Sequence, residues 1–203
     1  MDDTLSEAGR DAHGGKILYC AAEIHYGITQ VARELHSCLN SHRDNTDFIV
    51  VLEGGTYFAE RLLPRLWEKN QGEYGRVQHV KISTYGTGQR SSGTLKIEQD
   101  LKWSVEGRDT VIIEDLVDTG FTLSKLKKML LERGAKNVLI AALADKPAHR
   151  IREDGSLIIR PDVSAVTYDG TCWLYGCGMD INGDETSRQL PDLRIIPPKL
   201  PKL

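Results

Sequence analysis

The segment VIIEDLVDTGFTL, from Val111 to Leu123, indicates the fold class of this chain most directly. An apolar strand pattern comes first and ends in two adjacent carboxylates, Glu114 and Asp115. A third carboxylate, Asp118, follows, and the residues Thr119-Gly120-Phe121-Thr122 then open a helix. A buried strand that leads directly into a helix is the unit from which a parallel sheet with helical layers is built.

The segments on both sides of this stretch repeat the alternation of strand and helix. Apolar residues recur every three or four positions over 22–42, which predicts an amphipathic helix. Another helix is expected from about residue 56, with Pro64 kinking it or marking a break. Short apolar or alternating runs predict strands over 47–52, 77–84, 94–99, 110–113 and 137–143. The fold class is therefore α/β, with an open, mainly parallel sheet flanked by helices.

Three further regions complete the expected organisation. Residues 1–15 carry no apolar run and are expected to form a disordered tail. Residues 16–203 form one domain, with a small hood built from its N-terminal segment and about 161–203. Between two expected strands, residues 85–93 are rich in Gly and Ser, which is typical of a flexible closing loop.

Length and charge narrow the classes of function. The chain has 203 residues and a formal net charge of −3, so no overall positive field attracts nucleic acid or an anionic membrane. The four cysteines lack the short spacing of a zinc site and are expected to be free thiols in a reducing compartment. No signal peptide or membrane span is recognisable, so we expect a cytoplasmic protein.

The residues of the opening stretch suit a phosphorylated sugar. Backbone N–H groups at a helix start hold phosphate, and Gly120 lets the backbone approach the anion closely. Carboxylates at a strand end accept hydrogen bonds from sugar hydroxyls or carry Mg²⁺. The alternative is that the acids cap a helix and Gly120 merely makes the turn.

This stretch closely resembles the ribose-phosphate loop of the type I phosphoribosyltransferases. Four other segments extend the resemblance over about 47–192 and narrow it to the hypoxanthine-guanine branch: VVLEGG, STYGTGQRSSG, ALADKP, and WLYGCGMD followed by SRQLPDL. The resemblance implies that Glu114 and Asp115 bind the ribose hydroxyls and that Asp118 accepts a proton beside purine N7. It assigns the cradle of the 5′-phosphate to Thr119, Gly120, Phe121 and Thr122, with Phe121 contributing only its backbone.

The same resemblance assigns a purine site. Lys146 donates to the purine O6, Trp173 stacks on the base, and the backbone of Leu174 contacts the edge of the base. Taken alone, Lys146 is better interpreted as a solvated lysine before a proline turn, and Trp173 equally well as part of the hood core.

A pyrophosphate and metal site completes the set. The resemblance implies that Glu53 and Gly54 form the pyrophosphate loop, that Thr84 and Tyr85 belong to the closing loop, and that Arg188 binds pyrophosphate. It assigns Mg²⁺ to Asp180, Glu114 and Asp115, although Asp180 also reads as a turn residue and Tyr85 as a loop anchor.

Two positions depart from the family pattern. The family has lysine where this chain has Glu53, at a peptide bond that is cis in some relatives. The side chain of Glu53 is therefore expected to point away from the anion or to leave binding to its backbone. Arg188 lies farther from Asp180 than the family pattern places it, which leaves its role open.

Together these features predict transfer of the 5-phosphoribosyl group from 5-phosphoribosyl-1-pyrophosphate to N9 of hypoxanthine or guanine, giving IMP or GMP and pyrophosphate. A regulator that binds the sugar pyrophosphate without turnover, a xanthine-preferring enzyme and a pyrimidine-directed enzyme are the alternatives. By resemblance, a homodimer or homotetramer is expected.

Overall fold

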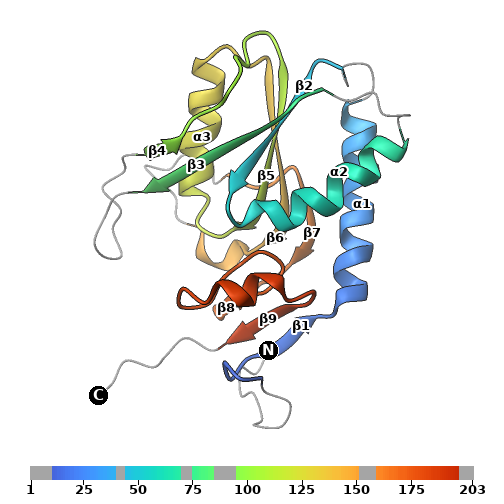
Figure 1. Ribbon diagram of the computed structural model, residues 1–203, viewed down its shortest axis with the longest axis vertical. Helices are drawn as coiled ribbons and strands as arrows, with labels where there is room; N and C mark the ends of the chain where they lie inside the picture. The colour runs from blue at the N-terminus through green and yellow to red at the C-terminus, as the bar shows by residue number, and fades with distance from the viewer. Residues whose placement is uncertain (1–10, 40–43, 70–74, 85–94, 151–158, 197–203) are drawn as a thin grey trace.

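A six-stranded sheet with the strand order β4-β3-β2-β5-β6-β7 forms the centre of the computed structural model, which describes residues 11–39, 44–69, 75–84, 95–150 and 159–196 (Figure 1). Every neighbouring pair of strands is parallel except β3 and β4, which are antiparallel. The predicted α/β class with a mainly parallel sheet is confirmed. In chain order the strands are β2 (Thr46–Leu52), β3 (Val77–Thr84), β4 (Leu95–Gln99), β5 (Asp109–Val117), β6 (Asn137–Asp145) and β7 (Val163–Thr167).

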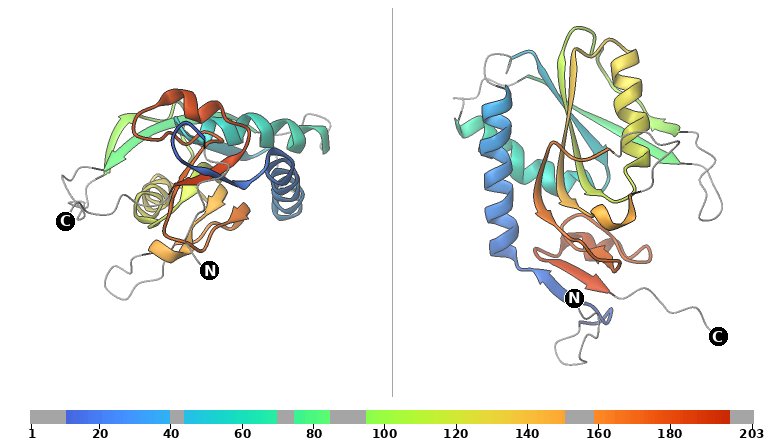
Figure 2. Two further views of the ribbon diagram at one scale, coloured as in Figure 1. Left: turned by 90° about the horizontal axis from the view of Figure 1, so that it is seen from below. Right: turned by 180° about the vertical axis from the view of Figure 1, so that it is seen from behind.

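Helices cover both faces of this sheet (Figures 1 and 2). The helices α1 (Ala21–Leu39) and α2 (Gly55–Lys69) share one buried core with Phe48 and Val50 of β2. The helix α3 (Phe121–Glu132) packs in a second core, which includes Ile49 and Val51 of the same strand. Successive side chains of a strand point to opposite faces, so β2 contributes to both cores in turn.

The helix α2 continues through Pro64 to Lys69, so this proline does not break the helix, and a kink at Pro64 stays a prediction. Proline removes the hydrogen bond to the carbonyl oxygen one turn earlier, here that of Glu60. Both Glu60 and Pro64 are exposed, and solvent can hydrate the carbonyl that the proline leaves without its partner.

A second, three-stranded sheet lies where the hood is expected. It consists of β1 (Lys16–Tyr19), β9 (Leu193–Ile196) and β8 (Trp173–Tyr175), in that order and with antiparallel pairing. In Figure 1 this sheet lies below the main sheet, and its strands come from both ends of the chain. Two short 3₁₀ helices, η1 (Pro147–His149) and η2 (Glu185–Gln189), complete the described elements.

The disordered tail predicted over residues 1–15 is too long. Asp11 accepts a hydrogen bond from the Tyr175 hydroxyl at 2.6 Å and forms an ion pair with Arg194. These two side chains belong to β8 and β9, so Asp11 attaches the segment before β1 to the small sheet. A charged group in the tail thus binds side chains that the sequence places far away.

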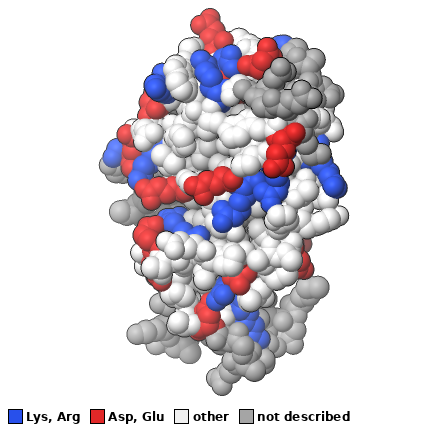
Figure 3. All heavy atoms as spheres, turned by 45° about the vertical axis from the view of Figure 1, so that its right-hand side comes forward, with Lys and Arg blue, Asp and Glu red and all other residues white. Residues whose placement is uncertain are grey.

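The surface carries mixed charges. Acidic and basic side chains lie next to each other across the face shown in Figure 3. Within the described residues, none of the helices combines the length and apolar character needed to cross a membrane. Because the charges on the face in Figure 3 are mixed, an anionic ligand would have to be held by local groups. The groups predicted for this role lie at one end of the main sheet.

Candidate active site

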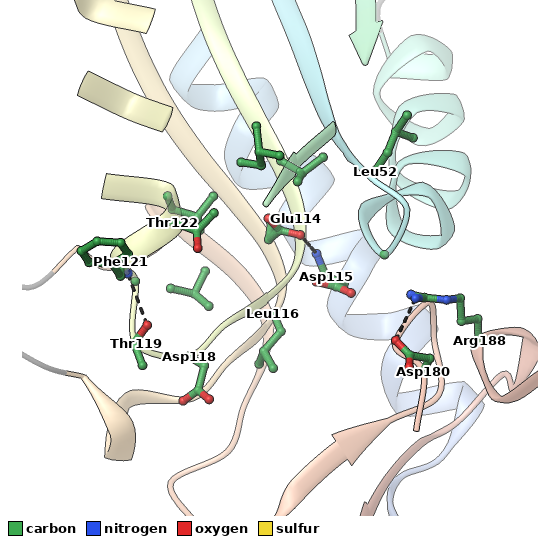
Figure 4. A pocket seen from close by; sticks show the side chains of 16 residues that line it. Leu52, Glu114, Asp115, Leu116, Asp118, Thr119, Phe121, Thr122, Asp180 and Arg188 are labelled. Carbon is green, nitrogen blue, oxygen red and sulfur yellow. Dashed lines mark hydrogen bonds and ion pairs between the residues drawn. The ribbon is translucent and has the colours of Figure 1, made fainter. Parts of the chain in front are cut away.

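A cavity of about 400 Å³ opens at the carboxyl ends of β2 and β5. Open parallel sheets generally bind their ligands at this edge. The segments that line the cavity come from three regions far apart in the sequence: the end of β2, the stretch from β5 into α3, and the hood (Figure 4). The predicted site residues that it brings together are Gly54, Glu114, Asp115, Asp118, Thr119, Gly120, Phe121, Thr122, Asp180 and Arg188.

The start of α3 forms the part of the cavity that suits a phosphate. Gly120 caps the helix with a φ of 74°, a left-handed conformation that favours glycine. Gly120 makes no side-chain hydrogen bond to the start of α3. The Phe121 N–H donates a long hydrogen bond of 3.4 Å to Thr119 Oγ1. The first N–H groups of α3 carry partial positive charge and can hold the oxygens of a phosphate.

The two adjacent acids lie inside β5 rather than beyond its end, because the strand continues to Val117. Asp115 donates its backbone N–H to Glu114 Oε1 at 3.1 Å, so both acids belong to one tight group. Burial raises the pKa of the Glu114 carboxyl well above its ordinary value, and the neighbouring Asp115 charge raises it further. Burial also raises the pKa of Asp115. Hydroxyl donors or a cation would stabilise the charged forms of this pair.

Gly54 leaves the room that Asp115 occupies. A Cβ atom at residue 54 would lie 1.7 Å from Asp115 Oδ2, so only glycine allows this contact. On the hood side, Gly178 has a φ of +104°, and a Cβ atom there would lie 2.4 Å from the Gly54 carbonyl oxygen. The loop after β2 is therefore packed between the acids of β5 and the hood, and neither glycine has space for a side chain.

Asp118 and Lys146, two predicted site residues of opposite charge, lie close to each other. The Lys146 backbone N–H donates to the Val117 carbonyl at 2.9 Å, which attaches the loop after β6 to the end of β5. Lys146 Nζ then lies 3.8 Å from Asp118 Oδ2. Burial lowers the pKa of Lys146, while the Asp118 charge acts in the opposite direction.

The hood contributes a cation to the opposite wall of the cavity. Arg188 donates to Asp180 at 2.7 Å, to Glu185 at 2.6 Å and to the Gly178 carbonyl at 2.6 Å. Figure 4 shows its guanidinium directed toward the side of the cavity that holds Asp115. Despite its unusual distance from Asp180 in the sequence, Arg188 thus reaches the cavity. Asp180 also accepts the Gly183 N–H at 3.0 Å, so it holds a turn as well.

Two of the alternatives for the purine site were wrong. Lys146 is only 3% exposed and is therefore no solvated lysine. Trp173 is 66% exposed and is therefore no part of the hood core. An exposed tryptophan is uncommon unless its ring has a partner to cover it. Leu174, its neighbour in β8, is buried.

The predicted closing loop falls mostly outside the described residues. Tyr85 lies in the segment 85–94, which the structure does not describe, and of Thr84 only the backbone position at the end of β3 is described. Their proposed roles remain predictions. Glu53, in contrast, is described: the Leu52–Glu53 peptide bond is cis, and the carboxylate of Glu53 binds Lys81.

Several residues of the site were missed from the sequence. Val51, Leu52 and Ile82 line the cavity through the ends of β2 and β3, and Gly178 closes the hood against Gly54. An apolar strand end carries no sign that it faces a ligand. For Gly178 the sequence did offer a hint, because the segment WLYGCGMD contains two closely spaced glycines. In the structure Gly178 has the positive φ that glycine allows.

The acids of the site do not form a metal cage by themselves. Across the described ranges there is no group of three His, Cys, Asp or Glu side chains placed to hold a metal ion. The pair Glu114 and Asp115 nevertheless offers carboxylate oxygens, which Mg²⁺ prefers. Such an ion fits here only if the ligand supplies most of the oxygens, as is usual for Mg²⁺ bound together with a phosphate compound.

Known proteins share this sequence and this architecture. The model of the phosphoribosyl transferase domain matches residues 21–174. The hypoxanthine-guanine phosphoribosyltransferase of Bacillus subtilis is 34% identical over 90% of this chain and 93% of its own. A solved hypoxanthine phosphoribosyl transferase of Trypanosoma cruzi superimposes with a TM-score of 0.78 at 28% identity, covering 89% of this chain and 90% of that one.

A longer relative matches as well. The bifunctional protein TilS/HprT of Listeria innocua is 35% identical over 91% of this chain, which spans only 26% of the Listeria protein. The match to the domain model covers most of the chain, and the Bacillus subtilis protein is matched over nearly its whole length. The chain belongs to the phosphoribosyltransferase family, in its hypoxanthine-guanine branch.

Proposed function

We propose that this protein transfers the 5-phosphoribosyl group from 5-phosphoribosyl-1-pyrophosphate to N9 of hypoxanthine or guanine, with IMP or GMP and pyrophosphate as products. One observation supports this above all. A single cavity combines a phosphate-binding helix start, the acid pair of β5 and the hood cation Arg188. A sugar that carries a phosphate at one end and a pyrophosphate at the other needs these three kinds of group.

The chemistry is a displacement at the anomeric carbon. The bond from purine N9 to C1′ forms while the bond from C1′ to the pyrophosphate oxygen breaks, and the electron pair of that bond leaves with pyrophosphate. Positive charge develops on the ribose, so positioning and electrostatic stabilisation matter more than a covalent nucleophile. Glu114 and Asp115 orient the ribose through its hydroxyls, and the start of α3 holds the 5′-phosphate.

Asp118 is proposed as the proton acceptor. When N9 attacks, the proton on N7 of the base has to leave, and the Asp118 carboxylate lines the cavity where it can take this proton. Lys146 Nζ lies 3.8 Å from that carboxylate and carries the opposite charge. Trp173, exposed on β8, supplies the face on which the base stacks, and the Leu174 backbone contacts the edge of the base.

The choice of base is proposed to depend on Lys146. Its buried ammonium donates to the 6-oxo group of hypoxanthine or guanine, whereas the 6-amino group of adenine offers no acceptor. A buried donor without a partner is costly, so adenine is rejected. Xanthine carries the same 6-oxo group, and preference for it is the main alternative within this reaction class.

Mg²⁺ is the proposed cofactor. When bound, the ion neutralises charge on the leaving pyrophosphate. Glu114, Asp115 and Asp180 would hold it together with oxygens of the substrate. We further propose a cytoplasmic homodimer or homotetramer and, for Tyr85 with Thr84, closure of the loop over the bound sugar.

A panel of bases tests the function. The purified protein is incubated with 5-phosphoribosyl-1-pyrophosphate, Mg²⁺ and one of hypoxanthine, guanine, xanthine, adenine or orotate, and nucleotide and pyrophosphate are measured. We expect products with hypoxanthine or guanine and none with adenine or orotate. Binding of the sugar pyrophosphate without any product would support the regulator instead, and a strong preference for orotate would support the pyrimidine enzyme.

A further inference from the structure

The loop after β2 carries a negative charge where an anion is expected to bind. Glu53 itself does not belong to the described residues that line the cavity, but its two neighbours in the chain, Leu52 and Gly54, both line it, so its charge lies at the edge of the cavity. A carboxylate in this position repels a pyrophosphate group and weakens its binding. The structure therefore has to offset this charge if the loop is to accept the substrate proposed above.

Lys81 is placed to offset it. Lys81 of β3 is the register partner of Leu52 of β2, so its side chain emerges next to the start of the loop. Its Nζ lies 2.9 Å from Glu53 Oε1 and donates a hydrogen bond to it. The next residue of the strand, Ile82, lines the cavity.

The pair is held by charge rather than by packing. The side chain of Lys81 is 42% exposed and that of Glu53 is 54% exposed. Exposed ion pairs generally add little to folding stability, because water already solvates both ions and the side chains lose freedom on pairing. Replacing either residue should therefore leave the fold intact, and an effect on ligand binding can be measured separately.

The pair also belongs to the electrostatic surroundings of the cavity. The hydrogen bond from Lys81 lowers the pKa of Glu53 most, and the nearby charge of Arg188 lowers it further. In turn, the hydrogen bond to Glu53 raises the pKa of Lys81, with smaller contributions from Glu98 and Glu185. Glu185 is the residue that binds Arg188 at 2.6 Å, so the charges around Glu53 connect to the hood cation of the cavity.

We propose that Lys81 is a positioning residue for the sugar pyrophosphate, which acts by neutralising Glu53 on the pyrophosphate-binding loop. This inference rests on the proposed function. It differs from direct contact between Lys81 and the substrate, because its effect exists only while Glu53 carries its charge. The two cases give opposite results when both side chains are replaced.

Four variants test the inference: Lys81→Met, Glu53→Gln, the double variant of these two, and Lys128→Met as the control. Lys128 pairs with Glu132 on the exposed side of α3 and lies outside the cavity, so its loss changes the net charge by the same amount. For each protein, Kd and KM for 5-phosphoribosyl-1-pyrophosphate, KM for hypoxanthine and the midpoint of thermal unfolding are measured.

We expect Lys81→Met to raise Kd and KM for the sugar pyrophosphate about three- to ten-fold, because Glu53 is left without its counter-charge. KM for hypoxanthine and the unfolding midpoint should stay near those of the Lys128→Met control. Glu53→Gln should lower both constants for the sugar pyrophosphate, and the double variant should return within about two-fold of the original protein. Raising the salt to about 1 M should shrink all these differences.

A double variant as impaired as Lys81→Met would overturn the inference in favour of direct contact. A Lys81→Met variant that binds like the Lys128→Met control would overturn it as well. Kd is measured without a base, so it tests the role of Lys81 even if the protein forms no nucleotide. Binding of the sugar pyrophosphate without any nucleotide product would refute the transferase proposal alone. If the original protein fails to bind the sugar pyrophosphate, both proposals fail.

Discussion

The acids at the two ends of the parallel sheet have opposite surroundings. At the amino ends of the strands, Asp47 has no exposed surface and accepts hydrogen bonds from three side chains. Arg76 donates at 2.9 and 2.6 Å, Arg108 at 2.8 Å and Gln78 at 2.9 Å. At the carboxyl ends, Glu114 and Asp115 lie side by side, and Arg188, whose charge lowers the pKa of Asp115, is bound to other acids.

The surroundings of these acids indicate that the amino ends of the sheet serve stability and the carboxyl ends serve ligand binding. A buried charge is tolerated where it has good partners, as at Asp47, and removing a partner is costly. Adjacent like charges with little access to water raise the energy of the folded chain. A protein keeps the unfavourable arrangement where a ligand is to supply the missing partner. The proposed binding of ribose hydroxyls and Mg²⁺ at the carboxyl ends would supply such a partner, while Asp47 at the amino ends links side chains at the starts of neighbouring strands.

The largest effect is expected at the carboxyl ends, for Asp118→Asn. The amide keeps the shape of the side chain but cannot take a proton from N7, so turnover should fall about 10²- to 10⁴-fold. Binding of the sugar pyrophosphate should change only modestly, and the unfolding midpoint should stay close to the original. Steady-state kinetics and calorimetric titration check this, and near-normal turnover would remove Asp118 from the mechanism.

At the amino ends, Asp47→Ala should instead unfold the protein without a special effect on chemistry. The replacement leaves Arg76 and Arg108 next to each other without their shared acceptor, which should cost about 3–5 kcal/mol of stability. Urea denaturation measures the loss. Any folded fraction should keep its KM for hypoxanthine; a stable variant that has lost turnover would contradict the division between the two ends.

The main sheet and its acid-rich end could be predicted from local sequence. The strand that ends in Glu114 and Asp115 carries a pattern within a few neighbouring residues, and the start of α3 at Phe121 carries another. Such patterns report periodicity and capping, which depend on short-range geometry. The strand itself is longer than its apolar part, because hydrogen bonds to β6 continue it through the acids to Val117.

Contacts between distant segments could not be predicted in the same way. The ion pair of Glu53 with Lys81 depends on the register of β2 against β3, which no local pattern specifies. The close contact of Gly178 with Gly54 depends on how the hood packs on the main sheet. Asp11 was placed in the tail because its neighbours are polar, although its partners are Tyr175 and Arg194.

A smaller effect of opposite sign is expected for Glu114→Gln. Burial holds the pKa of the Glu114 carboxyl well above its ordinary value, which makes this acid unfavourable at neutral pH in the ligand-free protein. The amide has no such cost, so the Glu114→Gln variant should be more stable than the original protein by about 1–2 kcal/mol at neutral pH, while turnover falls. Thermal unfolding measures the gain, with Glu132→Gln on the exposed side of α3 as the control. A less stable Glu114→Gln variant would show that the pair already has a sufficient partner within the protein.

The smallest effect should appear at Asp11, which attaches the N-terminal segment to the hood with the same kind of satisfied charge as Asp47. Burial raises the pKa of its carboxyl, but hydrogen bonds from Tyr175, Arg194 and two backbone N–H groups together lower it below the ordinary value of 3.8. An acid whose pKa is lowered in the folded state contributes stability above its ordinary pKa, and this stability is lost as the pH falls through the lower folded value.

Asp11→Asn should therefore cost about 1–2 kcal/mol at neutral pH. This difference should shrink as the solution is acidified below pH 3.8, because the carboxyl of the unfolded chain then takes up a proton while that of the folded chain still resists it. Urea denaturation across this range measures it, and a difference that stays constant with pH would show that Asp11 acts through shape rather than charge.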